Sequence, residues 1–107
     1  MISAAALALV LGQVPPPEFE QRVRADMRTQ LVDSESARYV FPEVRDDVLY
    51  CFWVNARNRS GGYVGYMPVQ VRATPEGGLA YEIASPFDYT ANLYSRECAR
   101  AGYIAPS

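Results

Sequence analysis

Arginine and tyrosine are the residues with which this chain of 107 residues can do chemistry, because it contains no His and no Lys. Without His, neither a Ser-His-Asp triad, nor a Cys-His pair, nor a His-ligated metal can form. Without Lys, Schiff-base chemistry and the P-loop are excluded as well. The ten basic residues are all Arg, whose planar guanidinium pairs well with carboxylates and phosphates. These absences favour recognition over catalysis.

The densest polar and aromatic cluster is the segment 55–66, which we expect at the tip of a hairpin. Gly61 and Gly62 allow positive φ angles and bring backbone N–H groups to the surface. Arg57 and Arg59 can act as paired donors to a carboxylate, a phosphate or an acidic partner. Tyrosine rings add flat amphipathic surface of the kind used in sugar and protein contacts. The predicted binding residues are Asn55, Arg57, Asn58, Arg59, Gly61, Gly62, Tyr63 and Tyr66.

The same segment also has a purely structural interpretation. Asn and Gly are the residues that tight turns need, so Asn55 can serve only to hydrogen-bond the loop backbone, and Gly65 can mark a bulge. The exposed Arg57 and Arg59 can serve only to keep the protein soluble. The sequence leaves both interpretations open.

Carboxylates offer the enzymatic alternative, a hydrolase in which Asp46 or Asp47 works with Glu82. A domain this small leaves little room for the cleft of such an enzyme, so we expect no enzymatic activity. Glu43, Asp46 and Asp47 lack the regular spacing of a calcium loop and are typical of a solvated turn. We therefore predict no metal and no cofactor. The net charge of −2 provides no general attraction to nucleic acid.

The first 12 residues are predicted to be a signal peptide. The apolar run from Ala4 to Leu11 is too short to span a membrane but suits the hydrophobic region of such a peptide, with cleavage expected before Gln13. Residues 13–107 are then one domain, periplasmic or secreted and not membrane-spanning. The alternative is that the apolar run is an N-terminal strand or helix of the fold.

Cys51 and Cys98 are the only cysteines, and an even count in a short exported chain favours one disulfide. A strand periodicity places Cys51 inward and a helical periodicity places Cys98 inward, so the pairing is a geometric expectation. Closing a loop of this length removes about 4 kcal/mol of denatured-state freedom in the chain-entropy model. The alternative is two buried free thiols in a cytosolic protein.

Hydrophobic spacing predicts an α+β fold: an N-terminal helix, a four-stranded antiparallel β-meander, and a C-terminal helix packed on the sheet and tied to it by the disulfide. The first helix carries one apolar stripe and should end near Val32, before a turn at 33–36. Period-two patterns between turn signals predict four strands. Their expected ranges are 38–44, 48–56, 63–72 and 79–84.

The last helix is predicted from a start signal at Ser85, which can cap it, with Pro86 at the first helical position. Gly102 supplies the stop. The stripe that should face the sheet consists of Phe87, Ala91, Tyr94, Cys98 and Ala101.

Two motifs in the middle of the chain resemble the signature of a family of small exported bacterial proteins of unassigned function. The first, Asp-Pro-x-Ser-Ala-x-Phe, here reads Asp33 to Tyr39. The second, Cys-Gly-x-Val-Asn-Ala-Lys/Arg-Asn followed by Gly-Gly-Tyr-x-Gly-Phe, here reads Cys51 to Asn58 and 61–66. This chain departs from the pattern at Ser34, Phe52 and Tyr66. The resemblance covers residues 33–68 and implies export, and the family offers no established activity to transfer.

These observations predict a non-enzymatic protein of the bacterial envelope or medium that binds an envelope protein or a cell-wall glycan through the hairpin. The alternative is a periplasmic inhibitor of a lysozyme-like hydrolase. Ser60-Gly61-Gly62-Tyr63 is similar to the Ser-Gly-x-x-Tyr loop of one such inhibitor family, although it is one residue shorter.

Overall fold

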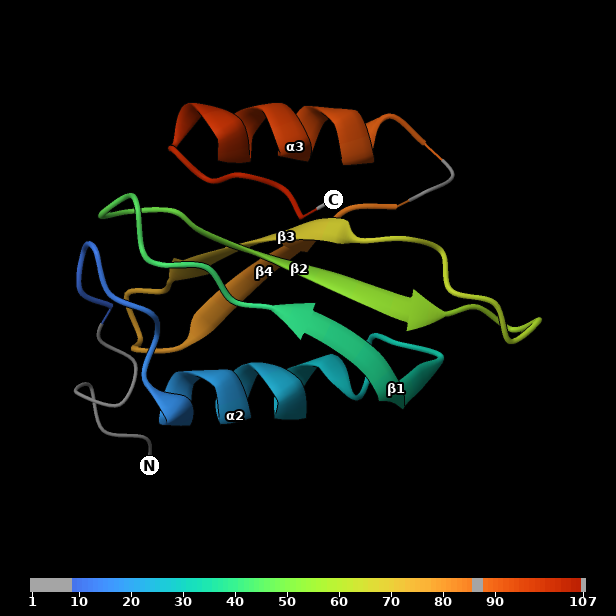
Figure 1. Ribbon diagram of the computed structural model, residues 1–107. Helices are drawn as coiled ribbons and strands as arrows, with labels where there is room; N and C mark the ends of the chain where they lie inside the picture. The colour runs from blue at the N-terminus through green and yellow to red at the C-terminus, as the bar shows by residue number, and fades with distance from the viewer. Residues whose placement is uncertain (1–8, 86–87, 107) are drawn as a thin grey trace.

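The computed structural model of the protein describes residues 9–85 and 88–106 (Figure 1). It consists of two helices and a four-stranded antiparallel sheet with the strand order β1-β2-β3-β4, which confirms the predicted α+β meander. The elements are α2 (Pro17–Met27), β1 (Asp33–Val40), β2 (Tyr50–Arg57), β3 (Met67–Ala73), β4 (Leu79–Ile83) and α3 (Thr90–Arg100).

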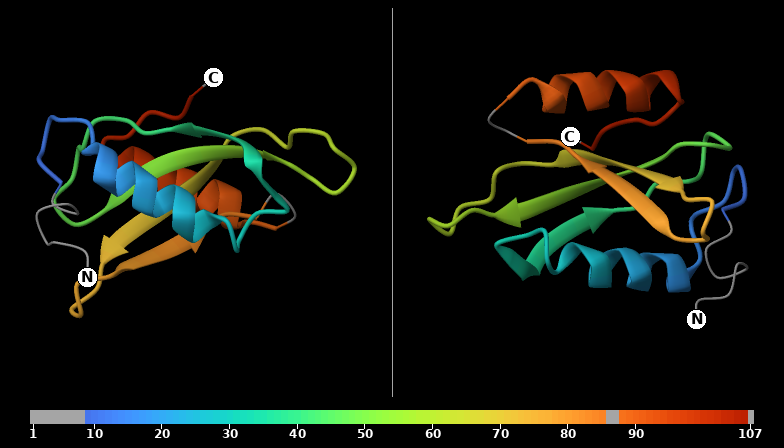
Figure 2. Two further views of the ribbon diagram at one scale, coloured as in Figure 1. Left: turned by 90° about the horizontal axis from the view of Figure 1, so that it is seen from below. Right: turned by 180° about the vertical axis from the view of Figure 1, so that it is seen from behind.

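The two helices cover opposite faces of the sheet, as Figure 1 and the view from behind in Figure 2 show. Strand β2 is therefore buried on both sides, and its first five residues are all inaccessible to solvent. Tyr50 packs edge-on against Phe19 of α2, while Cys51, the next residue, bonds to Cys98 of α3. Alternation along the strand thus sends successive side chains to different helices, which explains why β2 is apolar on both faces.

The predicted apolar stripe of the first helix was Phe19, Val23, Met27 and Leu31, and its first three members are completely buried on α2. Leu31 lies beyond the helix and is half-buried. The end of the helix was expected near Val32, and this prediction is wrong by five residues. The backbone N–H groups of Gln30 and Leu31 both donate to the carbonyl of Met27, which closes a turn at the end of the helix.

Strand β1 lies further toward the N-terminus than the sequence pattern predicts, and the turn expected at 33–36 is part of this strand. Asp33 pairs with Arg57 across the sheet, and a bulge separates this pair from the regular ladder that begins at Arg38. Pro42 lies beyond the strand, where its carbonyl accepts a 2.7 Å hydrogen bond from the Tyr50 hydroxyl. The predicted strand 38–44 is therefore corrected to Asp33–Val40.

Strand β3 begins at Met67 instead of Tyr63. Tyr63 still forms an isolated bridge with Arg57, but Gly65 has a φ of 94° and interrupts the extended chain between the bridge and the strand. The second and fourth strands match their predicted ranges to within two residues.

Helix α3 begins at Thr90, five residues after the expected cap at Ser85, and the residue before it is Tyr89, which makes no side-chain cap. The Thr90 hydroxyl instead accepts a hydrogen bond from the backbone N–H of Ser85. Pro86 and Phe87, which were predicted to belong to this helix, lie outside the described residues.

The end of α3 at Gly102 is confirmed. Gly102 has a φ of 101°, and its N–H donates to the Ala99 carbonyl while the N–H of Tyr103 donates to the Cys98 carbonyl. This pair of bonds is the Schellman motif, which satisfies carbonyls at a helix C-terminus and favours Gly.

The predicted disulfide is present: Cys51 and Cys98 are bonded, with their Cα atoms 6.0 Å apart. Both residues are completely buried, and Cys98 is the buried residue of α3. Because the rest of α3 is at least partly exposed, the disulfide is a major attachment of this helix to the sheet. Within residues 9–85 and 88–106, neither helix has the length and apolar character needed to cross a bilayer.

Candidate functional site

The tip of the β2–β3 hairpin is organised by the side chain of Asn58. Its Oδ1 accepts hydrogen bonds from the backbone N–H groups of Ser60 at 2.9 Å and Gly62 at 3.2 Å. The backbone N–H of Asn58 donates to the Gly62 carbonyl, and Gly61 adopts a positive φ of 86°. These hydrogen bonds hold residues 59–62 around the Asn58 side chain, so the exposed tip has a defined conformation.

Asn55 holds the β2–β3 connection at its other end, close to the start of β3. Its Oδ1 accepts a 3.0 Å hydrogen bond from the N–H of Gly65, the residue at which the strand is interrupted. Asn55 thus has the structural role that the sequence allowed. Tyr66, one residue further, is half-buried and packs against the hydrophobic core, so its ring contributes less surface to the hairpin than the sequence suggests.

Tyr63 joins the hairpin to β1. Its hydroxyl donates a 2.9 Å hydrogen bond to the carbonyl of Ser36, and its half-buried ring lies close to two guanidinium groups. The guanidinium carbon of Arg38 is 4.3 Å from the ring centroid, and that of Arg57 is 5.1 Å away. Both distances are within the range of cation–π attraction.

Arg38 is the member of this cluster that the sequence did not indicate. It lies on β1 opposite Asn55, so the sheet register brings it to the hairpin. Arg57 and Arg59 are exposed as predicted, and Arg59 makes no hydrogen bond or ion pair with any of the described residues. We call Arg38, Arg57 and Tyr63 the arginine–tyrosine cluster.

Two of the three carboxylates considered for catalysis are engaged elsewhere, and the third, Asp47, is exposed. Asp46 Oδ2 accepts backbone hydrogen bonds from Leu49 at 2.7 Å and Val48 at 3.0 Å, and these bonds lower the pKa of Asp46 below its usual range. Glu82 accepts a 3.1 Å hydrogen bond from the Tyr94 hydroxyl of α3. The described part of the chain also contains no group of three acidic or cysteine side chains placed to hold a metal ion.

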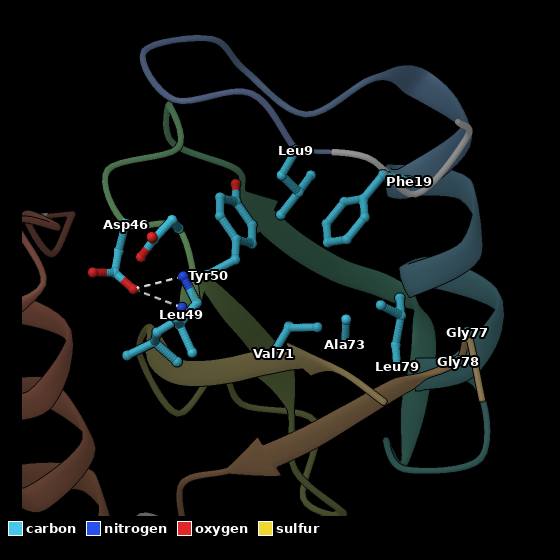
Figure 3. Close-up of a pocket in the computed structure, with 12 residues that line it drawn as sticks. Leu9, Phe19, Asp46, Leu49, Tyr50, Val71, Ala73, Gly77, Gly78 and Leu79 are labelled. Carbon is cyan, nitrogen blue, oxygen red and sulfur yellow. Dashed lines mark hydrogen bonds between the residues drawn. The ribbon is translucent and has the colours of Figure 1, made fainter. Parts of the chain in front are cut away.

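A second candidate site, which the sequence did not indicate, is an apolar cavity of about 340 Å³ on the α2 side of the sheet (Figure 3). It lies where the beginnings of α2 and β2 meet the turn between β3 and β4. Figure 3 shows Leu9 beside the rings of Phe19 and Tyr50 at this cavity. Its lining residues are Leu9, Phe19, Asp46, Asp47, Val48, Leu49, Tyr50, Val71, Ala73, Gly77, Gly78 and Leu79.

The segment before α2 is paired with the loop that leads into β2. The N–H of Gly12 donates to the Val44 carbonyl at 2.8 Å, and the N–H of Val44 donates to the Gln13 carbonyl at 2.9 Å. The predicted cleavage point between Gly12 and Gln13 falls within this pair of bonds. Leu9 packs against the core from the same segment.

The fold and the hairpin together define a small disulfide-bonded α+β domain that presents an arginine–tyrosine cluster where the β2–β3 hairpin meets β1. No model of a known protein family matches the chain, and neither a curated protein nor a solved structure matches it. The resemblance of residues 33–68 to a family of small exported bacterial proteins therefore stays a prediction.

Proposed function

We propose that this chain is a small binding module that contacts an envelope protein or a cell-wall glycan through the hairpin of residues 55–66. The observation that carries the proposal is the preformed shape of the hairpin, which Asn55 and Asn58 hold through side-chain hydrogen bonds to the backbone. A loop that is already ordered loses little conformational entropy when it binds.

The chemistry of the proposed partner follows from the side chains on this loop. Arg57 and Arg59 are exposed, and Arg38 and Arg57 both lie against the Tyr63 ring. Guanidinium groups recognise carboxylates through paired hydrogen bonds, and the aromatic ring adds a flat apolar contact. An acidic protein surface or a glycan that carries carboxylates fits this combination.

We place the module in the periplasm or outside the cell. The disulfide Cys51–Cys98 supports a non-reducing, extracytoplasmic environment, because cytosolic thiols are kept reduced. The proposed export also requires removal of residues 1–12, so the secreted protein should begin at Gln13. Sequencing the N-terminus of the protein from a periplasmic extract tests this point, and an intact N-terminus would contradict it.

A non-enzymatic role agrees with how two of the three candidate carboxylates, Asp46 and Glu82, are used. Asp46 is hydrogen-bonded to two backbone N–H groups in a turn, and its lowered pKa keeps it ionised, which is unsuited to a general acid. Glu82 is engaged with Tyr94.

The test compares capture of partners by the unchanged protein and by the double variant Arg57→Ala with Arg59→Ala. One arm is affinity capture from a periplasmic extract, and the other is co-sedimentation with purified cell wall. The matched control is Arg96→Ala with Arg100→Ala, which removes the same charge from exposed positions of α3. We expect the hairpin variant to lose binding in one arm while the control retains it. Equal binding by both variants would contradict the proposal.

The inhibitor of a lysozyme-like hydrolase is a second candidate, favoured by one observation. The β2–β3 connection extends beyond the ends of the other elements in Figures 1 and 2, and the tip at 60–62 is exposed. Because the Tyr63 hydroxyl is bonded to β1, the tip would enter a cleft through Ser60 and the two glycines. Such an inhibitor should suppress lysozyme turnover at a near-equimolar ratio. Full turnover at a large excess of the protein would rule it out.

A further inference from the structure

The apolar cavity has a lining whose charges all have one sign. Its walls come from aliphatic and aromatic side chains, and the Tyr50 hydroxyl is already used by the Pro42 carbonyl. Among the described residues that line the cavity, the charged ones are Asp46 and Asp47, and none is basic. A ligand that fits must therefore be mainly apolar and free of negative charge near these carboxylates.

Asp47 is the carboxylate available to a ligand. Asp46 is held by the backbone of Val48 and Leu49, and Figure 3 shows its carboxylate turned away from Phe19 and Tyr50. Asp47 is exposed and makes no hydrogen bond or ion pair with another residue in the described ranges. A cation at the cavity mouth would give this carboxylate its partner.

Leu9 shows that an aliphatic side chain packs at this site. Its side chain forms part of the cavity wall beside Phe19 and Tyr50 and is partly buried there (Figure 3). Leu9 belongs to the segment that we expect to be removed on export. Without Leu9, the space beside Phe19 and Tyr50 would be larger and open to another aliphatic group.

We propose that this cavity binds a small ligand with an aliphatic chain and a cationic end, and that Leu9 narrows the cavity until residues 1–12 are removed. The aliphatic part lies against Phe19 and Val71, and the cation pairs with Asp47. The role of Leu9 in narrowing the cavity rests on the proposed export, whereas the ligand chemistry does not. Neither depends on the hairpin.

The test uses the full chain and two probes of equal length, octylammonium and octanoate, with binding measured by calorimetry. Leu9→Ala should bind octylammonium about tenfold more tightly than the unchanged protein, because the octyl chain can use the space that the leucine side chain takes beside Phe19 and Tyr50. The same variant should prefer octylammonium to octanoate, and adding Asp47→Asn should reduce this preference about three- to fivefold.

Ala73→Phe places a ring in the cavity from an exposed position of β3 and should abolish binding in the Leu9→Ala background. Methyl NMR keeps the test decisive if this variant folds poorly, because octylammonium should shift the Val71 and Leu79 methyl resonances of the Leu9→Ala protein and leave hairpin resonances unchanged.

Equal affinity for both probes, or shifts confined to other surfaces, would overturn the ligand chemistry. Equal affinity of the Leu9→Ala and unchanged proteins would overturn the role of Leu9. Loss of hairpin binding in the arginine variants bears only on the proposed function.

Discussion

The guanidinium carbon of Arg38 lies 4.3 Å from the centre of the Tyr63 ring, so a residue of β1 completes a surface that the β2–β3 hairpin begins. Tyr63 in turn donates its hydroxyl proton to the Ser36 carbonyl on β1. These two contacts attach the hairpin to the edge strand. The Arg38 guanidinium thus stabilises the hairpin and also belongs to the surface that we propose binds a partner.

Replacing Arg38 should therefore have two effects. We expect Arg38→Ala to lower the free energy of unfolding by about 0.5–1 kcal/mol, the usual contribution of an exposed cation–π contact. It should also weaken partner binding, since a third guanidinium is lost beside Arg57. Urea denaturation measures the first effect and co-sedimentation the second. Arg28→Ala, at an exposed position beyond α2, is the control, and equal behaviour of the two variants would argue against a role for Arg38.

Asn58 should be the main determinant of the conformation of the hairpin tip. Asn58→Ala removes the acceptor of two backbone hydrogen bonds, and we expect a loss of about 1–2 kcal/mol in the free energy of unfolding. The amides of Ser60 and Gly62 should exchange with solvent faster, which hydrogen exchange followed by NMR detects. Asn92→Ala, on the exposed side of α3, is the matched control and should leave these two amides unchanged. Unaltered exchange in Asn58→Ala would show that the tip is held by other contacts.

The disulfide should supply a large share of the stability of the domain. Its two cysteines are 47 positions apart, and a loop of that size corresponds to about 4 kcal/mol in the chain-entropy model. We expect Cys51→Ser with Cys98→Ser to lower the urea midpoint accordingly and to loosen α3, whose buried residue is Cys98. Equal urea midpoints for the oxidised protein and the variant would contradict this expectation.

The elements of the fold were predictable because local periodicity encodes them. The stripe from Phe19 to Met27 identified α2, and the inward positions of Cys51 and Cys98 identified their pairing. The errors arose where a long-range contact decides a boundary. Asp33 belongs to β1 because it pairs with Arg57, and no pattern near Asp33 reveals that partner.

In the candidate site, too, local features were predictable and long-range ones were not. The hairpin was found from its composition, and the turn-forming roles of Asn55 and Asn58 follow from the ordinary chemistry of Asn. Arg38 was missed because its place beside Tyr63 depends on the register of β1 against β2. The cavity was missed because three separate parts of the chain line it, and an incompletely filled space leaves no periodic signal in any one of them.

The turn that Asp46 forms before β2 should make the stability of the domain depend on pH. Hydrogen bonds from the Leu49 and Val48 N–H groups lower the pKa of the folded-state carboxylate, so its contribution is fully present above the unfolded pKa of about 3.9. It is lost as the pH falls from there through the lowered folded pKa. Asp46→Asn keeps a side-chain acceptor but cannot titrate, and should flatten this part of the pH dependence. Asp47→Asn is the control for the loss of one carboxylate, because Asp47 accepts no hydrogen bond from a described residue. Urea midpoints measured from pH 7 to pH 2 compare the three proteins, and an identical acid slope in Asp46→Asn would assign the effect to other carboxylates.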